Sequence, residues 1–153
     1  HFSLLDHDPK ALSEATSLIQ TIENNLNAKI DVDLIKGSVR TLLFSRSFNQ
    51  KWGQFHFIYS MGLFDYLSAP VAKAVITKLY QMLKPGGEMV IGNFHTSNPS
   101  RYYMEYWCDW VLNLRTEEEF IALSADIPSA NHSIIFEDTD CQIFLHIKKQ
   151  AKG

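Results

Sequence analysis

Short apolar runs alternate along this chain with longer stretches whose apolar residues recur at helical spacing. Phe55–Ser60 is a run of aromatic and β-branched residues, as a buried strand requires, and residues 2–5 and 32–35 have a similar character. Residues 9–22 and 71–82 instead place an apolar residue at every third or fourth position, which predicts one buried stripe on each of two helices. The stripe of the second helix consists of Val71, Val75, Leu79 and Met82. Strands that alternate with helices predict an α/β fold with right-handed crossovers.

Cap and turn residues mark where the helices begin and end. Asp8 before Pro9, and Ser68 before Pro70, are typical helix starts, because a polar side chain accepts a free N–H and proline fits the first turn. The Lys-Pro-Gly-Gly sequence at 84–87 ends the second helix and predicts a tight turn into a strand that begins at Glu88. The polar stretch 41–53 has no regular pattern, and we predict that it is irregular.

The C-terminal part of the chain has helix and strand signals of its own. Thr116 and Glu119 form a capping box, which predicts a short helix that continues to Ala122. Ser133–Glu137 and Cys141–Lys148 have the pattern of two strands joined by a tight turn. We therefore expect the sheet to finish in an antiparallel hairpin.

A further predicted helix, which opens at Asn98-Pro99, is unusually aromatic. The apolar residues on one face of this helix are Tyr103, Trp107, Trp110, Val111 and Leu114. Most such stripes belong to a protein core. The alternative is the wall of a substrate pocket or a surface for a partner, because aromatic side chains are also prominent in binding sites. The sequence leaves both interpretations open.

Composition narrows the class of protein. A length of 153 residues fits one domain, and 46% apolar with 20% charged residues is ordinary for a globular chain. The net charge of −3 argues against a nucleic-acid-binding surface, and the sequence lacks the apolar run that a membrane span requires. The two cysteines follow no disulfide pattern, which favours a reducing, cytoplasmic location.

Two motifs carry a resemblance to a known family. Residues 55–67 have the sequence FHFIYSMGLFDYL, and residues 83–94 have the sequence LKPGGEMVIGNF. Together they resemble the central segment of class I S-adenosylmethionine-dependent methyltransferases, in which LKPGG lies between a helix and a strand. Over residues 1–153 the resemblance implies a Rossmann-like methyltransferase sheet, mostly parallel with a C-terminal antiparallel hairpin. It also implies S-adenosyl-L-methionine as cofactor and methyl transfer to a small-molecule or fatty-acid-like acceptor, such as the carboxyl group of a hydroxy fatty acid.

The expected cofactor contacts begin at Asp6, at the end of the first strand, where parallel α/β sheets bind ligands. A carboxylate there can accept both hydroxyls of a ribose, and the alternative is that Asp6 only caps the loop or helix. The resemblance favours ribose binding, because LLDHDPKAL is similar to the second-strand motif of the family. It also implies adenine contacts from Ser38, which replaces the acid common in the family, and from the backbone N–H of Val39. The other expected cofactor contacts are His7, Ser60 and Met61.

The acceptor side has catalytic and binding candidates. His95 is the candidate general base, because its charge state changes near neutral pH, and Tyr66 is the second catalytic candidate. The alternative for His95 is a loop histidine without a role. The residues expected to bind the substrate are Phe64, Asn93, Arg101, Tyr103 and Trp107.

A carboxylate acceptor would need little catalytic machinery. It is ionised at neutral pH and needs no general base, and Arg101 or Arg115 can orient it through a bidentate contact. Ser60 and Asn93 occupy strand ends where metal-dependent members of the family have acids, so we expect no metal site. A proline-proline-aromatic motif is missing after Ser60, which disfavours methylation of nucleic-acid bases.

The first strand of the family and its glycine-rich loop have no counterpart in this sequence. In the family that strand lies between the strands that here end at Asp6 and Ser60, so its absence would leave backbone groups unpaired. We therefore expect an N-terminally incomplete domain that borrows a strand or pairs its strands differently, as in a homodimer. The alternative function is a non-catalytic, methyltransferase-like module that binds a partner through its aromatic helix.

Overall fold

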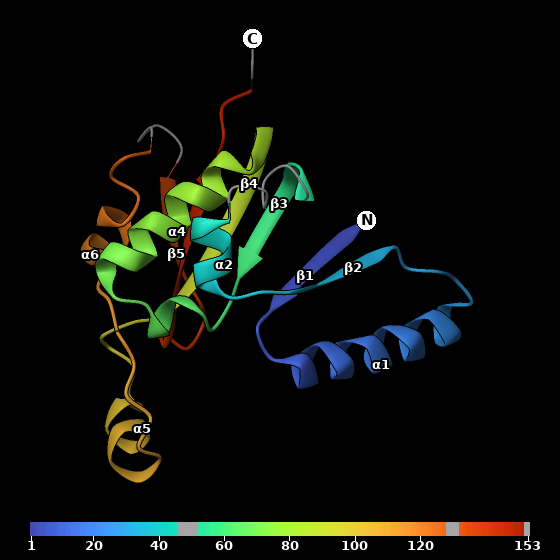
Figure 1. Ribbon diagram of the computed structural model, residues 1–153. Helices are drawn as coiled ribbons and strands as arrows, with labels where there is room; N and C mark the ends of the chain where they lie inside the picture. The colour runs from blue at the N-terminus through green and yellow to red at the C-terminus, as the bar shows by residue number, and fades with distance from the viewer. Residues whose placement is uncertain (46–51, 128–131, 152–153) are drawn as a thin grey trace. The chain divides into compact units, whose positions relative to one another are not determined.

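The protein consists of two compact units. The computed structural model describes residues 1–45, 52–127 and 132–151. Unit 1 covers His1–Phe48 and unit 2 covers Asn49–Gly153. The strands of each unit form a separate sheet, with two strands in the first and four in the second (Figure 1).

Unit 1 is a strand–helix–strand crossover. Strands β1 (Phe2–Asp6) and β2 (Val32–Lys36) pair in parallel, and helix α1 (Pro9–Leu26) connects them (Figure 1). The predicted start of α1 is confirmed, because the Asp8 side chain accepts a hydrogen bond from the Lys10 N–H at 2.8 Å. This capping satisfies one of the backbone donors that a helix leaves free at its first turn.

A short helix follows β2 and corrects one prediction. Helix α2 (Val39–Phe44) occupies the first part of the stretch 41–53, which we predicted to be irregular. Ser38 is the reason, since its hydroxyl oxygen accepts a hydrogen bond from the Thr41 N–H at 3.3 Å and caps the helix. Residues 46–51 of the predicted stretch lie outside the described part of the chain.

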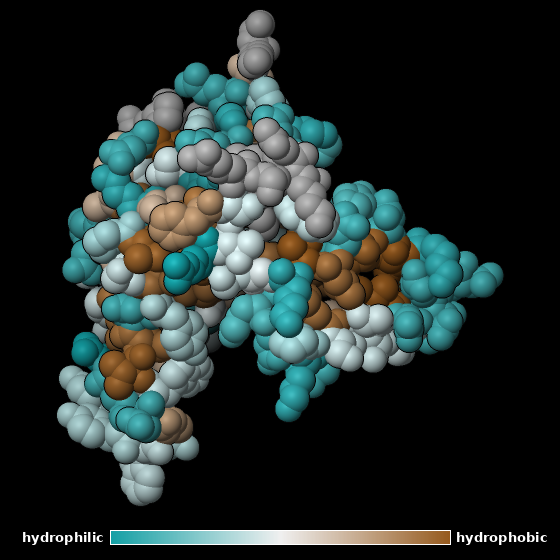
Figure 2. All heavy atoms as spheres, in the orientation of Figure 1, coloured by the Kyte–Doolittle hydropathy of each residue, from teal (hydrophilic) through white to brown (hydrophobic). Residues whose placement is uncertain are grey.

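Unit 1 buries few apolar side chains. No residue of α1 is buried, and Ile35 and Leu42 are the buried apolar residues in the described part of this unit. Phe2 is 64% exposed, and Figure 2 shows apolar side chains lying open over the region of β1 and β2. The apolar stripe predicted for α1 is therefore at most half-buried.

Unit 2 contains a four-stranded sheet in the order β3-β4-β6-β5. Strand β3 (Phe55–Ser60) pairs in parallel with β4 (Leu83–Phe94), and β4 pairs antiparallel with β6 (Gln142–Lys148). Strand β5 (His132–Phe136) pairs with the other side of β6, which confirms the predicted C-terminal hairpin (Figure 1). The last strand of the chain, β6, therefore lies between β4 and β5 in the sheet.

Strand β4 begins earlier than predicted. Leu83 lies opposite Phe55, and Glu88 lies opposite Phe57, so residues 84–87 bulge out between two paired stretches. The Lys-Pro-Gly-Gly turn is therefore a bulge within β4, where Gly86 has a φ of 77° that its missing side chain permits.

Two helices cover one face of the sheet of unit 2. Helix α4 (Ala69–Gln81) contacts β4, and helix α6 (Glu117–Ala122) contacts β5 and β6. The capping box of Thr116 and Glu119 at the start of α6 is confirmed. The fully buried side chains that line this core include Ala72, Val75, Ile76, Phe120, Met89, Ile91 and Leu145.

The predicted stripe of α4 is confirmed in part, because Val75 and Met82 are buried as expected and Leu79 is half-buried. Val71 is 36% exposed, and the buried residues of this helix are Ala72, Val75 and Ile76. Ser68 occupies the N-cap position but makes no hydrogen bond there with its side chain.

The opposite face of the same sheet is open. Phe57 and Tyr59 of β3 are 54% and 61% exposed, and their rings stack with centroids 6.1 Å apart. We predicted β3 as a buried strand, and only the face that carries Ile58 packs inward. Among the described strands β3 pairs only with β4, and β1 only with β2. The predicted homodimer stays a prediction.

The aromatic helix is shorter and more exposed than a core helix. Helix α5 (Arg101–Trp107) ends before Trp110, so the predicted face does not form as one stripe. Met104 is its buried residue, whereas Tyr103 is 63% and Trp107 83% exposed. The interpretation of these aromatic side chains as core residues is therefore wrong, and the alternative, a binding surface, remains.

Candidate functional site

The carboxyl ends of β1 and β2 bring four of the predicted cofactor residues to one edge of unit 1. Asp6 is the last residue of β1, with His7 directly after it. Ser38 and Val39 follow the end of β2, which lies beside Asp6 because the Gly37 N–H donates to the Asp6 carbonyl at 2.9 Å. This is the edge where parallel α/β sheets bind ligands.

The Asp6 carboxylate is partly committed and partly available. Its Oδ1 accepts a hydrogen bond from the Asp8 N–H at 2.8 Å and lies 3.3 Å from His7 Nδ1. Within the described residues Oδ2 accepts no hydrogen bond, and 43% of the side chain is exposed. Asp6 therefore fixes its own loop with one oxygen and presents the other to solvent, so both interpretations made from the sequence fit its geometry.

Ser38 caps the N-terminus of α2 at this edge. Its hydroxyl accepts the Thr41 N–H and lies 3.3 Å from Thr41 Oγ1. Val39 is the first residue of α2, and the described residues give no acceptor to its N–H. The backbone at Val39 is therefore the freer of the two expected adenine contacts.

The carboxyl ends of β3 and β4 form the corresponding edge of unit 2. Met61 follows Ser60 at the end of β3, and its sulfur lies over Gly92, where a Cβ would come within 2.8 Å of it. The 3-10 helix η1 (Phe64–Tyr66) comes next and contacts β4. Phe94 at the end of β4 packs against Trp110 with ring centroids 6.2 Å apart.

Tyr66 and Trp110 form a hydrogen-bonded aromatic pair at this edge. The Trp110 Nε1–H donates to the Tyr66 hydroxyl oxygen at 2.8 Å, and Tyr66 is 58% and Trp110 41% exposed. The Tyr66 oxygen accepts this bond, and no residue in the described ranges accepts its proton, which can therefore be donated outward. The predicted catalytic candidate is thus oriented and open to solvent.

A buried polar cluster lies beneath this pair. It consists of Asp65, Asn93 and Arg115, which are 2%, 1% and 5% exposed. The Asp65 carboxylate accepts the Phe94 N–H at 2.7 Å, and Arg115 donates to Asn93 Oδ1 and to the Phe64 carbonyl. Nearly every polar atom here has a partner, as burial requires.

Burial corrects three of the predicted substrate contacts, namely Phe64, Asn93 and Arg115. Phe64 has no exposed surface, and Asn93 is 1% exposed with its amide committed to Phe94 and Asn113 carbonyls. The guanidinium of Arg115 is committed to backbone carbonyls and Asn93. A substrate cannot reach any of the three in this structure. They lie beneath the exposed Tyr66–Trp110 pair and stabilise the backbone that carries it.

Burial shifts the protonation of the two charged members of the cluster. Desolvation raises the pKa of the Asp65 carboxyl group, and the hydrogen bond from Phe94 and the charge of Arg115 oppose that shift only in part. Desolvation likewise lowers the pKa of Arg115, although Asp65 opposes it. Burial therefore disfavours the charged form of each group, and the neighbouring groups offset this effect only in part.

We expect a pH-dependent difference between the wild type and Asp65→Asn. A raised pKa in the folded state means that Asp65 contributes stability below its ordinary pKa of 3.8, and this is lost as the pH rises through the folded pKa. The free energy of unfolding of the wild type, relative to Asp65→Asn, should therefore fall as the pH rises above about 4. Urea denaturation of both proteins between pH 4 and 8 measures it; a difference that grows in favour of the wild type would contradict the burial argument.

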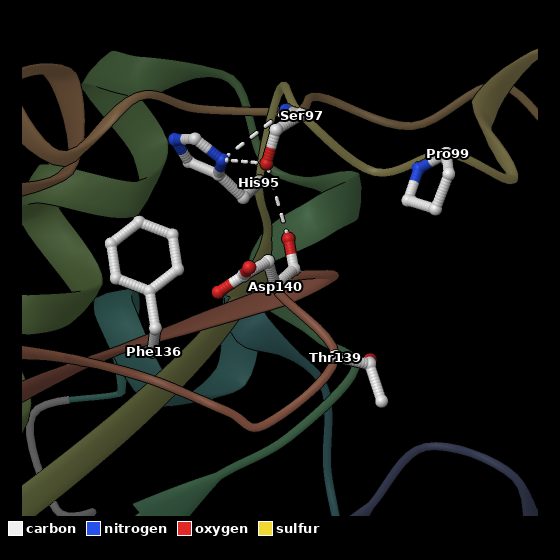
Figure 3. A pocket seen from close by; sticks show the side chains of 6 residues that line it. All are labelled: His95, Ser97, Pro99, Phe136, Thr139 and Asp140. Atoms are coloured by element: carbon white, nitrogen blue, oxygen red, sulfur yellow. Dashed lines mark hydrogen bonds between the residues drawn. The ribbon is translucent and has the colours of Figure 1, made fainter.

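His95 lies beside an open depression of about 540 Å³ that Ser97, Pro99, Phe136, Thr139 and Asp140 also line (Figure 3). Its Nε2 is 3.1 Å from Glu117 Oε2, and its Nδ1 is 2.6 Å from Ser97 Oγ. The Ser97 hydroxyl also donates to the Asp140 carbonyl at 3.1 Å. Both ring nitrogens have partners within the chain, so the general-base role of His95 stays a prediction.

The remaining substrate candidates lie on α5. Arg101 donates through Nε to Glu105 at 2.8 Å, and its two terminal nitrogens have no partner among the described residues. Arg101 and Trp110 line one small hollow. Tyr103 and Trp107 are exposed on the helix. Arg101 is thus the arginine that remains available for a carboxylate.

Sequence reasoning missed the partner of Tyr66 and the cluster that supports it. Trp110 has the spacing of a helical stripe, and Asp65 lies within the motif GLFDYL, for which the sequence predicts no role of this residue. A charged residue inside the apolar motif GLFDYL was the available signal, because a buried charge requires a partner. The partners themselves carry no local signal, because the Phe94 N–H that the Asp65 carboxylate accepts lies 29 residues further along the chain, and Arg115 lies 51 residues beyond the Phe64 carbonyl that it binds.

Neither a membrane helix nor a metal centre is found in the described residues. None of the helices there combines the length and apolar character that a bilayer crossing needs. Within the same ranges, no three His, Cys, Asp or Glu side chains come together as metal ligands would.

Comparison with known proteins identifies the fold. No family model matches the sequence, and no curated protein matches it. Among solved structures, a protein from Bordetella parapertussis described as a possible exported protein matches with a TM-score of 0.74 and 17% identity. The match covers 97% of this chain and 53% of that one.

Two methyltransferases are also similar in structure. Magnesium protoporphyrin IX methyltransferase (ChlM) from Synechocystis PCC 6803, solved with bound S-adenosylhomocysteine (SAH), has a TM-score of 0.65 and 11% identity, over 97% of this chain and 63% of that one. An O-methyltransferase family protein from Burkholderia thailandensis has a TM-score of 0.67 and 15% identity, over 99% and 43%. This chain thus spans about half the length of these neighbours. Its fold is that of the class I S-adenosylmethionine-dependent methyltransferases.

Proposed function

We propose that this chain binds S-adenosyl-L-methionine and takes part in methyl transfer to a small acceptor that carries a carboxylate, with a hydroxy fatty acid as the specific candidate. The observation that supports the cofactor most is the Asp6 carboxylate, with one oxygen available at the carboxyl end of a parallel strand. Bound S-adenosylmethionine supplies an electrophilic methyl group on its sulfonium. Solved neighbours that hold S-adenosylhomocysteine agree with this choice.

The residues of unit 1 suit the nucleoside end of such a cofactor. Asp6 Oδ2 can accept a ribose hydroxyl in a charge-assisted hydrogen bond. The N–H of Val39, to which the described part of the chain gives no acceptor, can donate to a ring nitrogen of adenine. Ser38, which caps α2, contributes by holding that N–H in place rather than by accepting a strong bond itself.

The surface of unit 2 suits an anionic acceptor. Tyr66 can donate its free proton to a carboxylate oxygen, and the terminal nitrogens of Arg101 can form a bidentate contact. An ionised carboxylate is already a nucleophile, so these residues need only hold and orient it. The exposed rings of Trp110 and Trp107 offer apolar contact for the rest of the acceptor.

Methyl transfer to matched acceptors tests the proposal. The protein is incubated with methyl-labelled S-adenosylmethionine and a 3-hydroxy fatty acid, the corresponding amide or the corresponding amine. We expect base-labile labelled ester from the acid and no label in the amide. Label in the amine alone would assign the chain to N-methylation, and no label with any acceptor would reject the enzymatic proposal.

Tyr66→Phe should lower kcat/KM for the acceptor without weakening the binding of the cofactor. Loss of one hydrogen bond to an ionised carboxylate corresponds to about 1.5–3 kcal/mol, or roughly ten- to a hundred-fold in kcat/KM. The affinity for S-adenosylhomocysteine should stay unchanged. Tyr59→Phe is the matched control, since Tyr59 is equally exposed but lies on the open face of the sheet. Equal losses in both variants would remove Tyr66 from the acceptor site.

The exposed aromatic residues of α5 favour a second candidate, a methyltransferase-like module that binds a partner. Tyr102, Tyr106 and Trp107 are 67%, 80% and 83% exposed, and the first two stack with centroids 6.4 Å apart. Clusters of this type are enriched in protein interfaces. An inactive protein whose partner binding is lost on Trp107→Ala would support this candidate over the enzyme.

A further inference from the structure

One short segment of unit 2 holds the backbone of η1 from below. Arg115 Nη1 donates to the Phe64 carbonyl at 2.8 Å, and Nη2 donates to the Leu67 carbonyl. Between these two contacts, the Asp65 carbonyl accepts the backbone N–H of Asn113 at 2.7 Å and its side-chain amide at 3.1 Å. Three carbonyls around η1 are thus fixed by two residues.

The same segment is fixed to the end of β4. The Arg115 N–H donates to the Phe94 carbonyl at 3.1 Å, and the Phe94 N–H donates to the Asp65 carboxylate at 2.7 Å. Asn93 accepts from Arg115 and donates to the Asn113 carbonyl at 2.9 Å. The result is a buried network that ties together three stretches distant in sequence.

The network has an exposed counterpart. Tyr66 is part of η1, whose carbonyls Asn113 and Arg115 bind, and Trp110 lies three residues before Asn113 in the chain. Their side chains meet on the surface through the hydrogen bond from Trp110 Nε1 to the Tyr66 hydroxyl. Both ends of this surface contact are therefore anchored by the same buried groups.

We propose that Arg115 is a positioning residue of the acceptor surface, which acts through the carbonyls of Phe64 and Leu67 to keep the Tyr66–Trp110 pair together. Lysine cannot replace it, because its single ammonium group cannot match the planar fork that reaches two carbonyls and Asn93 at once. The role of the pair in acceptor binding rests on the proposed function. The dependence of the Tyr66–Trp110 contact on Arg115 is independent of the proposed function, and it can be measured without enzymatic turnover.

Fluorine NMR of the full chain labelled with 5-fluorotryptophan tests this dependence. The three tryptophans give three resonances, which single replacements of Trp52, Trp107 and Trp110 by phenylalanine assign. Tyr66→Phe calibrates the shift that loss of the hydrogen bond produces at Trp110. We expect Arg115→Lys to shift the Trp110 resonance by a comparable amount and to leave the Trp107 resonance in place.

Arg101→Lys is the matched control, and it should move the Trp110 resonance less than Arg115→Lys does. A stability loss in Arg115→Lys with an unmoved Trp110 resonance would mean that Arg115 only supports the fold, and would overturn the proposal. If Arg115→Lys does not fold, Asn113→Ala decides. This variant removes the hydrogen bond from the Asn113 side chain to the Asp65 carbonyl and keeps the bond from the Asn113 backbone N–H. A shifted Trp110 resonance there supports the proposal, and an unmoved one overturns it, whether or not methyl transfer is detected.

Discussion

Arg115→Met is expected to lower the free energy of unfolding by about 3–5 kcal/mol, the range for breaking a buried charged network by removing one partner. Methionine fills a similar volume but donates no hydrogen bond, so the Phe64 and Leu67 carbonyls and Asn93 lose their donor inside the protein. Asp65 would also lose the positive charge that opposes the rise of its pKa. Urea denaturation monitored by circular dichroism measures the change.

Arg101→Met provides the control for this prediction. The Arg101 side chain is 44% exposed and forms an ion pair with Glu105 one helical turn away. Exposed pairs of this kind contribute about 0.3–0.5 kcal/mol, so the variant should be almost as stable as the wild type. A loss below about 1 kcal/mol in Arg115→Met as well would show that the network is not the stabilising element that its burial indicates.

Asp6→Asn is expected to weaken the binding of S-adenosylhomocysteine by ten- to a hundred-fold, or about 1.5–3 kcal/mol, if Asp6 accepts a ribose hydroxyl. Asparagine keeps an oxygen that can accept the Asp8 N–H, so the loop should persist while the charge is lost. Isothermal titration calorimetry of both proteins measures the two affinities.

Asp33→Asn is the matched control within unit 1. Asp33 is on β2, where its carboxylate lies 3.2 Å from His1 Nε2 and far along the strand from the carboxyl end. Its replacement removes a negative charge from the same unit without touching the proposed ribose contact. If both variants bind with equal affinity, the effect is one of general charge and Asp6 has no specific role.

Local signals were enough to predict most elements. Asp8 with Pro9, and Thr116 with Glu119, act within one helical turn, and both caps are present. The hairpin after His132 was equally readable, since alternation and a tight turn specify it. These features depend on neighbours a few residues away, so a single sequence contains them.

Features that depend on distant residues could not be predicted in the same way. Phe57 and Tyr59 have the character of buried residues, but no described element of unit 2 covers their face of the sheet. The exposed helix α5 is a similar case, because an aromatic stripe does not show whether a partner or a core meets it. The contacts of Arg115 span about fifty residues, and the sequence suggested only that it was free to bind an acid.

The candidate site was predicted in outline and corrected in detail. The positions of Asp6, at the end of β1, and of Tyr66, in the connection that follows β3, are set by the order of the elements. Which side chains face outward depends on packing, which placed Phe64 and Asn93 inside and left Trp110 at the surface.

An NMR titration of the isotope-labelled protein with S-adenosylhomocysteine tests the central proposal most directly. We expect saturable amide shifts that include Asp6, His7 and Val39, at the carboxyl ends of the strands of unit 1. In Asp6→Asn the same shifts should need a higher ligand concentration to saturate. Saturable shifts confined to the open face around Phe57 and Tyr59, or no saturable shifts at all, would contradict it.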